Sequence, residues 1–334
     1  MNIVILGAGI AGLACADALL VAGHSVTLFD KGRAPGGRMA TRRIATPAGE
    51  ASFDHGAQYF TVRHPAFRSQ VLRWQAAGLA APWPAAGSDA WVGTPSMAAP
   101  VRAMATPHDI RFPVQIDAIG RDGPHWQVDG TSFDALAIAL PAEQAAPLLR
   151  PVHPAFADLA GQTPAAPCWT VMAAFAAPLP APDILREEGP IGWAARNNAK
   201  PGRTGPESWV VQAGPDWSRA HLERSPSEIV SLLLDALATR LGQPLRTPLA
   251  ATAHRWRYAR SGAQGSASLW DPAARLGVCG DWLLGPRVEA GWLSGTNLAA
   301  AVVAIERQPV ACVERLQPDP ACPAAARARP QCRA

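Results

Sequence analysis

The feature that most constrains the fold is a glycine-rich turn that follows a short apolar strand. Residues 2–6 read NIVIL, which is typical of a buried parallel strand, and GAGIAG follows at residues 7–12. The apolar positions after this turn predict a helix that stops at Gly23. The run SVTLFD, residues 25–30, predicts a second strand. The start of the chain therefore predicts a βαβ unit with its glycines at the first turn.

The glycine spacing at this turn predicts a dinucleotide site. In G-x-G-x-x-G, the first glycine makes the turn, the second admits a pyrophosphate and the third lets helix and strand pack closely. Gly7, Gly9 and Gly12 fill these positions, and the helix N-terminus then faces the phosphates. Asp30 ends the second strand, where its carboxylate accepts hydrogen bonds from ribose hydroxyls and repels a 2′-phosphate. We expect FAD or NAD here; the alternative is a generic βα turn.

A second glycine pair just after this acid favours FAD over NAD. Gly36 and Gly37 precede Arg38, and in two-dinucleotide flavoproteins a G-G-R element approaches the pyrophosphate from the far side. The glycines leave room, and the planar guanidinium of Arg38 offers a fork of donors to phosphate oxygens. A solvated arginine loop is the alternative for the other arginines of this stretch: Arg33, Arg42 and Arg43.

The stretch DHGAQYFT, residues 54–61, predicts a strand edge with Gly56 at a point of close approach. Gln58 and Tyr59 would present polar atoms to the isoalloxazine or the ribityl chain. His55 reads more simply as a structural histidine.

The rest of the chain alternates strand and helix signals. Residues 111–130 predict a hairpin that turns near Asp122 and Gly123. A helix begins at Ser225, where Glu228 completes a capping box. Gly242 ends that helix. Short apolar runs predict further strands, at residues 133–141, 168–177, 207–214 and 275–281.

A last helix is expected from about residue 287 to residue 306. Its positive N-terminal end would face the pyrimidine ring of a flavin, where the reduced ring carries negative charge. Gly291, Ser294 and Gly295 within it suit close approach to a cofactor. Packing of this helix on the sheet is the alternative.

Composition excludes several classes of protein. The 334 residues are 49% hydrophobic, which suits about two domains, and the net charge of +4 is dispersed and predicts no nucleic-acid partner. No apolar run reaches the length of a membrane span, and the glycines of the first 23 residues argue against a signal peptide. The cysteines form no C-x-x-C or zinc spacing, so we expect no metal and a reducing cytoplasm. Residues 307–334, which hold Cys312, Cys322 and Cys332, are predicted to be disordered; the role of this tail stays open, as does that of Lys200, one of two lysines.

The chain resembles bacterial renalase-like FAD-dependent amine oxidoreductases, within the monoamine oxidase and protoporphyrinogen oxidase superfamily. The resemblance extends to about residue 306. GAGIAGL and DKGRAPGGRM mark the superfamily. The renalase-like branch is indicated by DHGAQYFT, NNAKPGR, HRWRYA and GDWLLGPRVEAGWLSG.

This resemblance implies the fold and the cofactor contacts. The fold is α/β, a glutathione-reductase-2-like flavoprotein with a Rossmann-type FAD-binding domain and an inserted β-rich (α+β) substrate domain. The FAD-binding domain takes residues 1–75, 101–150 and 256–306, and the substrate domain takes residues 76–100 and 151–255. FAD is held non-covalently, with Cys279 buried. The implied FAD contacts are Gly7, Gly9, Ala11, Gly12, Asp30, Lys31, Gly37, Arg38, Met39, Gln58, Tyr59, Val114, Asp281 and Val288.

The resemblance also implies an oxidase reaction. Renalases pass hydride from 2- or 6-dihydronicotinamide isomers of NAD(P)H to flavin N5, and dioxygen then takes the electrons as hydrogen peroxide. An amine or porphyrinogen-type oxidase is the alternative, and a flavin-binding protein without turnover is a third reading. Trp292, His254 and Asn198 are the expected catalytic residues, although core packing explains the tryptophans of this region equally well. We expect a monomer or homodimer that acts on a small molecule.

Overall fold

The computed structural model describes residues 1–306, and its first lobe is built on a six-stranded sheet. All neighbouring strands of this sheet are parallel except β18 and β19. The order across the sheet is β18 (Leu269–Asp271), β19 (Leu276–Val278), β12 (Ala135–Ile138), β1 (Asn2–Leu6), β2 (Ser25–Phe29) and β8 (Asp109–Arg111).

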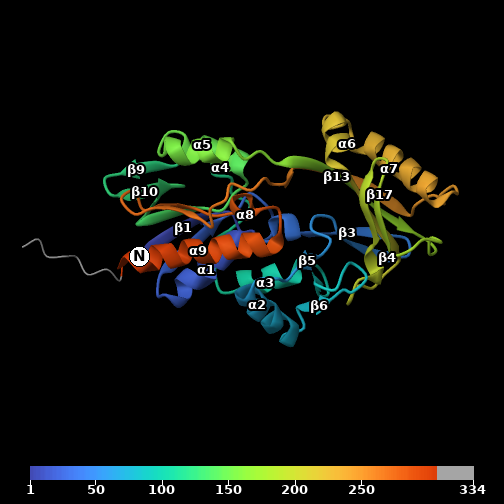
Figure 1. Ribbon diagram of the computed structural model, residues 1–334, viewed down its shortest axis with the longest axis horizontal. Helices are drawn as coiled ribbons and strands as arrows, with labels where there is room; N and C mark the ends of the chain where they lie inside the picture. The colour runs from blue at the N-terminus through green and yellow to red at the C-terminus, as the bar shows by residue number, and fades with distance from the viewer. Residues whose placement is uncertain (307–334) are drawn as a thin grey trace, which may run out of the picture.

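Alternate residues of β1 point to opposite faces of this sheet, as the period of a strand requires. Ile3 and Ile5 face the core beneath α1 (Ile10–Val21) and α9 (Val288–Glu306). Val4 and Leu6 face the core beneath α4 (Ala142–Leu149) and α5 (Pro154–Gly161). Figure 1 shows α1 beside α9, with α4 and α5 on the other side of β1. A strand buried on both faces explains the unbroken apolar run.

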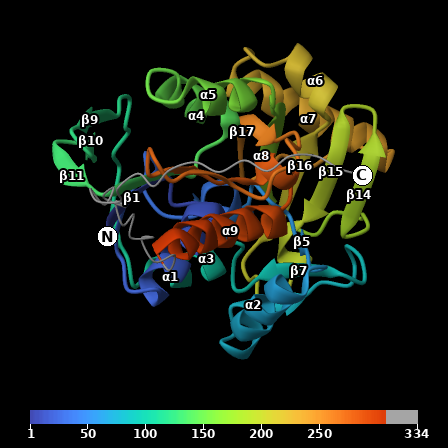
Figure 2. The same ribbon diagram turned by 60° about the vertical axis from the view of Figure 1, so that its left-hand side comes forward.

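The second lobe is built on a five-stranded antiparallel sheet from the later part of the chain. Its order is β14 (Ile184–Glu188), β15 (Ile191–Arg196), β16 (Glu207–Ala213), β13 (Ala166–Phe175) and β17 (Ala250–Arg260). Trp169 and Val171 of β13 pack under α7 (Pro226–Leu241), whereas Met172 and Ala174 pack against β4. β4 therefore covers part of the face opposite α7, and Figure 2 shows this sheet beside the first lobe.

Smaller elements join the two lobes. β3 (Thr41–Thr46) and β4 (Gly49–Asp54) form a hairpin. The remaining strands form two small sheets: β5 (Phe60–Thr61), β7 (Ala90–Gly93) and β6 (Ala80–Pro82); and β11 (Thr131–Phe133), β10 (His125–Val128) and β9 (Gly120–Asp122). The remaining helices are η1 (Gly37–Met39), α2 (Pro65–Ala76), α3 (Ala99–Ala105), η2 (Asn197–Ala199), α6 (Pro215–Ala220) and α8 (Asp281–Leu284).

Most local predictions are confirmed, and one is partly wrong. The predicted α/β class is confirmed, and α7 carries the expected capping box, in which the Ser225 hydroxyl accepts from Glu228 N–H. The hairpin predicted over residues 111–130 spans only β9 and β10. The segment before it instead adds β8 to the parallel sheet beside β2, a pairing that no local pattern reveals.

The division into two domains stays a prediction, and β17 crosses the expected boundary after residue 255. The tail predicted to be disordered, residues 307–334, lies outside the described residues. Within residues 1–306, no helix is long and apolar enough to cross a membrane.

Candidate cofactor site and active site

Two glycine turns face each other at the end of β1. Gly7 has a φ of +107°, and a Cβ there would lie 2.7 Å from the carbonyl oxygen of Ala139. A Cβ on Gly12 would lie 2.0 Å from the carbonyl oxygen of Gly7, whereas a Cβ on Gly9 would meet nothing within 4 Å. Gly7 and Gly12 are therefore required by packing, and the side of Gly9 is open, as the approach of a pyrophosphate requires.

The second turn lies across this opening. Gly36 N–H donates to the carbonyl oxygen of Ala8 at 3.1 Å. Gly37 has a φ of +51°, and a Cβ there would lie 3.7 Å from the Cα of Gly9. A side chain at Gly37 would therefore enter the space between the turns, whereas one at Gly36 would face Val101 and Ala40. The glycines thus leave a cradle bounded by backbone, which fits a dinucleotide pyrophosphate.

The acid at the end of β2 fixes the first turn. Asp30 accepts from Ala8 N–H at 2.7 Å through Oδ2 and from Gly32 N–H at 2.6 Å through Oδ1. A carboxylate oxygen has two lone pairs, so both oxygens retain an acceptor site for ribose hydroxyls.

A pocket of about 260 Å³ lies beside Asp30. Lys31 and Val114, both predicted to bind FAD, line it together with Phe29 and Leu140. The N–H of Val114 donates to the carbonyl oxygen of Asp30 at 2.9 Å, so only its own carbonyl is free to meet a ligand. The pocket therefore suits the adenosine end of FAD.

Arg38 and Asp281, two predicted cofactor residues, meet beyond the cradle. Arg38 Nη2 lies 2.6 Å from Asp281 Oδ1, although the residues are far apart in the chain. The carbonyl oxygen of Arg38 accepts from Ala57 N–H at 2.8 Å, and a Cβ on Gly56 would lie 2.0 Å from that oxygen. The close approach predicted at Gly56 is thus to the Arg38 backbone. It brings the DHGAQYFT segment next to the cradle.

The glycines of α9 serve helix packing instead of the cofactor approach that we expected. A Cβ on Gly295 would lie 2.0 Å from the carbonyl oxygen of Ala11, and one on Gly291 would lie 2.9 Å from Ile10. Ser294 accepts from Gly280 N–H at 2.9 Å. These contacts join α9 to α1 and to the turn before Asp281. They therefore position α1 and α9 beside the cradle, and the glycines of α9 do not line the cradle itself.

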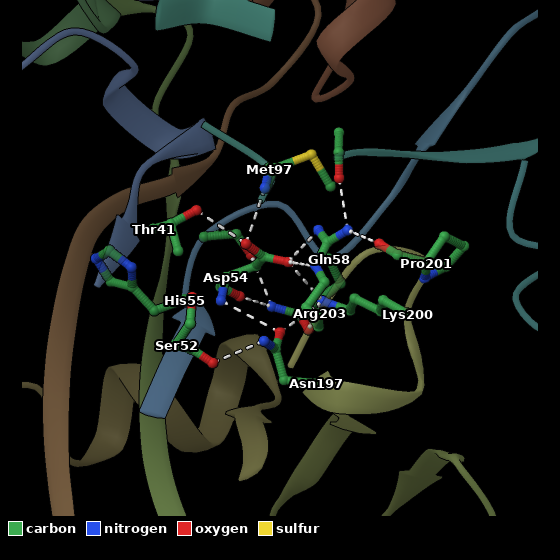
Figure 3. Close-up of polar contacts among 12 residues, drawn as sticks. Thr41, Ser52, Asp54, His55, Gln58, Met97, Asn197, Lys200, Pro201 and Arg203 are labelled. Carbon is green, nitrogen blue, oxygen red and sulfur yellow. Dashed lines mark hydrogen bonds and ion pairs between the residues drawn. The ribbon is translucent and has the colours of Figure 1, made fainter. Parts of the chain in front are cut away.

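A buried charge cluster lies where β4 ends (Figure 3). Asp54 Oδ1 accepts from Thr41 Oγ1 and from Met97 N–H, both at 2.9 Å. Its Oδ2 lies 2.6 Å from Arg203 Nη2 and 3.3 Å from Lys200 Nζ. The side chains of Asp54, Lys200 and Arg203 are at most 1% exposed. Both cations come from the NNAKPGR stretch.

Lys200 connects this cluster to Gln58, a predicted FAD contact. Its ammonium donates to Gln58 Oε1 at 3.1 Å and to Asn197 Oδ1 at 3.2 Å. Gln58 Nε2 donates to the carbonyl oxygens of Asp54 and Gly56. Lys200 therefore fixes which end of the Gln58 amide faces which neighbour, since an ammonium can only donate.

The cluster carries one excess positive charge. Burial raises the pKa of Asp54, but the nearby Lys200 and Arg203 outweigh it and lower that pKa to about 2. Burial lowers the pKa of Lys200 to about 8, against the opposing effect of Asp54. One carboxylate thus faces two cations at neutral pH. Among the salt bridges of residues 1–306, no second carboxylate pairs with either cation.

Aromatic rings cover the other side of residues 54–59. His254 and Trp256 of β17 share one face, and each ring centroid lies 5.1 Å from that of His55. Burial and the adjacent His254 lower the pKa of His55 to about 4. Burial and Arg42 also lower the pKa of His254. Both imidazoles are therefore neutral at pH 7, and Figure 3 shows His55 on the opposite side of the segment from Lys200.

The other predicted catalytic residues lie apart from these rings. Trp292 is 9% exposed and packs on Phe67, with ring centroids 5.6 Å apart. Asn198 donates to Glu207 Oε2 at 3.4 Å and accepts from the backbone of Ser208. Its neighbour Asn197 joins the charge cluster instead.

Three other predicted cofactor residues pack close to this region. Met39 is buried in the core, Tyr59 lies against Trp193 with ring centroids 5.3 Å apart, and Val288 is partly buried at the start of α9. Cys279 is buried and free, as expected. No group of His, Cys, Asp and Glu within the described residues could hold a metal ion.

Sequence reasoning missed Asp54 and Arg203 and left Lys200 open. The available signal was that Lys200 is one of only two lysines in the sequence. Its partner could not be named, because Asp54 precedes Lys200 by 146 residues.

Comparison with known families assigns the chain. The family model of flavin-containing amine oxidoreductases matches residues 85–303, and that of NAD(P)-binding Rossmann-like domains matches residues 5–73. The chain belongs to the flavin-containing amine oxidoreductase family. As a member of this family with a fitting dinucleotide cradle, it is an FAD-dependent oxidoreductase.

Solved structures share the fold of this amine oxidoreductase at low sequence identity. A candidate protoporphyrinogen oxidase from Exiguobacterium has a TM-score of 0.70 at 12% identity, covering 91% of this chain and 99% of its own. Cyclohexylamine oxidase from Brevibacterium oxydans has a TM-score of 0.64 at 16% identity, covering 92% and 99%. Hydroxyneurosporene desaturase from Rhodobacter capsulatus is 43% identical over 63 residues, which are 19% of this chain and only 12% of that protein.

Proposed function

We propose that this amine oxidoreductase oxidises isomeric dihydronicotinamide nucleotides, the 2- or 6-dihydro forms of NAD(P)H, in a renalase-like reaction. The donor and one proton react with dioxygen to give NAD(P)⁺ and hydrogen peroxide. Bound FAD supplies the two-electron chemistry that connects the donor to dioxygen. The observation that carries the proposal is the charge of the region around Gln58.

This charge favours an anionic donor over a cationic amine. Lys200 and Arg203 exceed Asp54 by one positive charge, and Arg42 lies close enough to affect both histidines. The other buried carboxylates here are engaged: Asp281 pairs with Arg38, and Glu289 accepts from the backbone N–H groups of Arg63 and His64. An ammonium substrate would therefore meet repulsion, and no free buried carboxylate faces this region within residues 1–306. A dinucleotide carries negative phosphates and is attracted.

The aromatic side of the region suits a flat ring. His55, His254 and Trp256 present uncharged rings within 5.1 Å of one another. A planar dihydropyridine can stack or make edge contacts with such rings. Since His55 and His254 resist protonation, they add no cation beside the positively charged nicotinamide that forms.

The reaction needs little acid–base catalysis from the protein. Removal of hydride from a dihydronicotinamide leaves an aromatic pyridinium, so no group must take a proton from the donor. The weakly basic His55 and His254 are compatible with this requirement. The tasks left to the chain are binding, orientation and exclusion of water, which together account for large rate effects when the reacting atoms are held about 3–3.5 Å apart.

The test is anaerobic reduction of the purified flavoprotein, followed at 450 nm by stopped flow. We expect rapid bleaching by 2- or 6-dihydroNAD(P), and slow or no bleaching by 4-dihydroNAD(P)H and primary amines. Recovery of the colour in air should yield hydrogen peroxide. Rapid bleaching by an amine alone would establish an amine oxidase instead, and bleaching by a porphyrinogen alone would establish a porphyrinogen oxidase. A flavin that no donor bleaches would indicate a binding protein.

A matched pair of variants on β17 tests the aromatic face. His254→Ala should slow reduction without emptying the flavin site. Arg255 lies next to it on the opposite face, where it donates to the carbonyl oxygen of Leu222 and to Glu223. Arg255→Ala should therefore leave the reduction rate unchanged. Equal rates in the two variants would remove His254 from the donor site.

A further inference from the structure

The buried cluster of Asp54, Lys200 and Arg203 adjoins the cofactor cradle through a short path. Gly37, at the cradle, precedes Arg38, whose carbonyl oxygen accepts from Ala57 N–H at 2.8 Å. Gln58 follows directly, and its amide oxygen accepts from Lys200 at 3.1 Å. The cluster therefore lies behind the segment that is predicted to face the flavin.

The cluster holds one more buried cation than is needed to connect the surrounding elements. Asp54 alone connects β3, β4 and the turn before α3 through its contacts to Thr41 and Met97. Arg203 completes the tie by donating to the carbonyl oxygens of Gly93 and Pro201. Lys200 is a second buried cation on the same carboxylate, which is costly unless the excess charge has a partner.

We propose that Lys200 is a positioning residue which orients Gln58 and holds one excess positive charge beside the bound flavin, so that the reduced, negatively charged flavin is stabilised. The inference rests on FAD binding and not on the identity of the electron donor. Failure of the donor assay would therefore leave it standing.

The physical argument is electrostatic. Reduced flavin gains negative charge, and a fixed cation in a water-poor site stabilises that charge without reorganisation. Lys200 is 0% exposed in its side chain, so solvent screens its charge little. Removal of the cation should weaken binding of the reduced flavin relative to the oxidised flavin by at least about tenfold, which is about 30 mV for a two-electron couple.

The experiment measures the reduction potential of the bound flavin in four proteins. Lys200→Met keeps a chain of similar length without the charge, and we expect its potential to fall by about 30 mV or more. Asp54→Asn removes the carboxylate that raises the pKa of Lys200, so it is measured at a pH low enough for Lys200 to keep its proton. There it leaves two cations unopposed and should raise the potential. Lys200→Arg restores the charge and should restore most of the potential. Arg240→Met is the control. It removes one exposed positive charge on α7, where Arg240 pairs with Glu188, and should leave the potential unchanged.

The signs of the two shifts in reduction potential distinguish an electrostatic role of Lys200 from a merely structural one. A loosened site would shift the potentials of Lys200→Met and Asp54→Asn in the same direction. Opposite shifts, with rescue by Lys200→Arg, would support the proposal. Shifts of the same sign, or an unchanged potential in flavin-loaded Lys200→Met, would overturn it.

If the variants lose FAD, the pH dependence of the reduction potential of the wild-type protein provides a second test. Lys200 is faced by Asp54 from β4, by Arg203 and Asn197 from its own loop, and by the Trp83 ring at 5.5 Å. Asp54 is already ionised and an arginine is not deprotonated in proteins, so Lys200 is the group of this cluster that titrates near pH 8. As pH rises through this range, Lys200 loses its proton and the potential should fall more steeply than it does at lower pH. A constant slope across pH 7–9 would contradict the proposal.

Discussion

The tight contact between α1 and α9 makes a quantitative prediction about two glycines on the same helix. A Cβ on Gly295 would lie 2.0 Å from the carbonyl oxygen of Ala11, whereas one on Gly291 would meet side-chain atoms instead of backbone, with the Cγ2 methyl of Ile10 nearest at 2.9 Å. Real Cβ atoms need at least about 3.0 Å, so Gly295→Ala must separate the helix backbones by about 1 Å. Gly291→Ala needs only a small shift of Ile10.

The magnitude follows from two opposing contributions. Both substitutions gain about 1 kcal/mol of helix propensity, because glycine is unfavourable inside a helix. Gly295→Ala also bears an overpacking cost of about 1–3 kcal/mol, since backbone must move. We therefore expect the free energy of unfolding of Gly295→Ala to be about 1–3 kcal/mol below that of Gly291→Ala.

The separation of α1 from α9 in Gly295→Ala should also lower the affinity for FAD. Ala11 lies in the first turn of α1, whose free N–H groups face the cradle at Gly9. Loss of one charge-assisted phosphate contact is worth about 1.5–3 kcal/mol, so FAD affinity of Gly295→Ala should fall roughly ten- to a hundredfold. Urea unfolding of both variants gives the stability difference, and flavin fluorescence on dilution gives the affinity. A Gly295→Ala protein as stable as Gly291→Ala, with wild-type FAD affinity, would refute the reasoning.

Three further predictions concern the cofactor and pH. Arg38→Ala should weaken FAD binding roughly ten- to a hundredfold, whereas Arg43→Ala should have little effect because Arg43 is exposed and pairs loosely with Glu50; equal losses in a flavin titration would contradict this. Acid or heat should release FAD from the precipitated protein, and colour retained in the pellet would indicate a covalent link. Burial lowers the pKa of His55 from 6.5 to about 4, so between these pH values the unfolded state binds a proton that the folded state does not. Stability should therefore fall as pH is lowered from about 6.5 to about 4, and the urea midpoint of His55→Gln should depend less on pH over this range; an identical profile would count against a buried neutral His55.

Features encoded by neighbouring residues could be predicted from the sequence. The capping box of α7 needs only Ser225, Pro226 and Glu228, and the turn at Gly7–Gly12 has its signature within six residues. The alternation in HRWRYA places His254 and Trp256 on one face if the segment is a strand, and the structure shows that it is one, β17.

Features that depend on residues far apart in the chain could not be predicted from the sequence. The sequence signal at Gly291 and Gly295 is the same whether a helix or a cofactor approaches, and only the fold shows that α1 does. Asn197 and Asn198 are equivalent in the sequence, and the direction of η2 decides that Asn197 meets Lys200 while Asn198 meets Glu207. The burial of Lys200 depends on Asp54, which a different element supplies.

The strand order of the six-stranded sheet has a consequence for synthesis of the chain on the ribosome. β1 pairs with β2 early, but its other neighbour, β12, and then β19 and α9 emerge much later. At about 5–20 residues per second, the roughly 280 residues between α1 and the middle of α9 take about 15–60 s to translate. During this time the apolar face of α1 lacks its cover, whereas the five-stranded sheet within residues 166–260 can already be complete. We therefore expect the nascent chain to assemble its later lobe first and to acquire its flavin only near the end of translation.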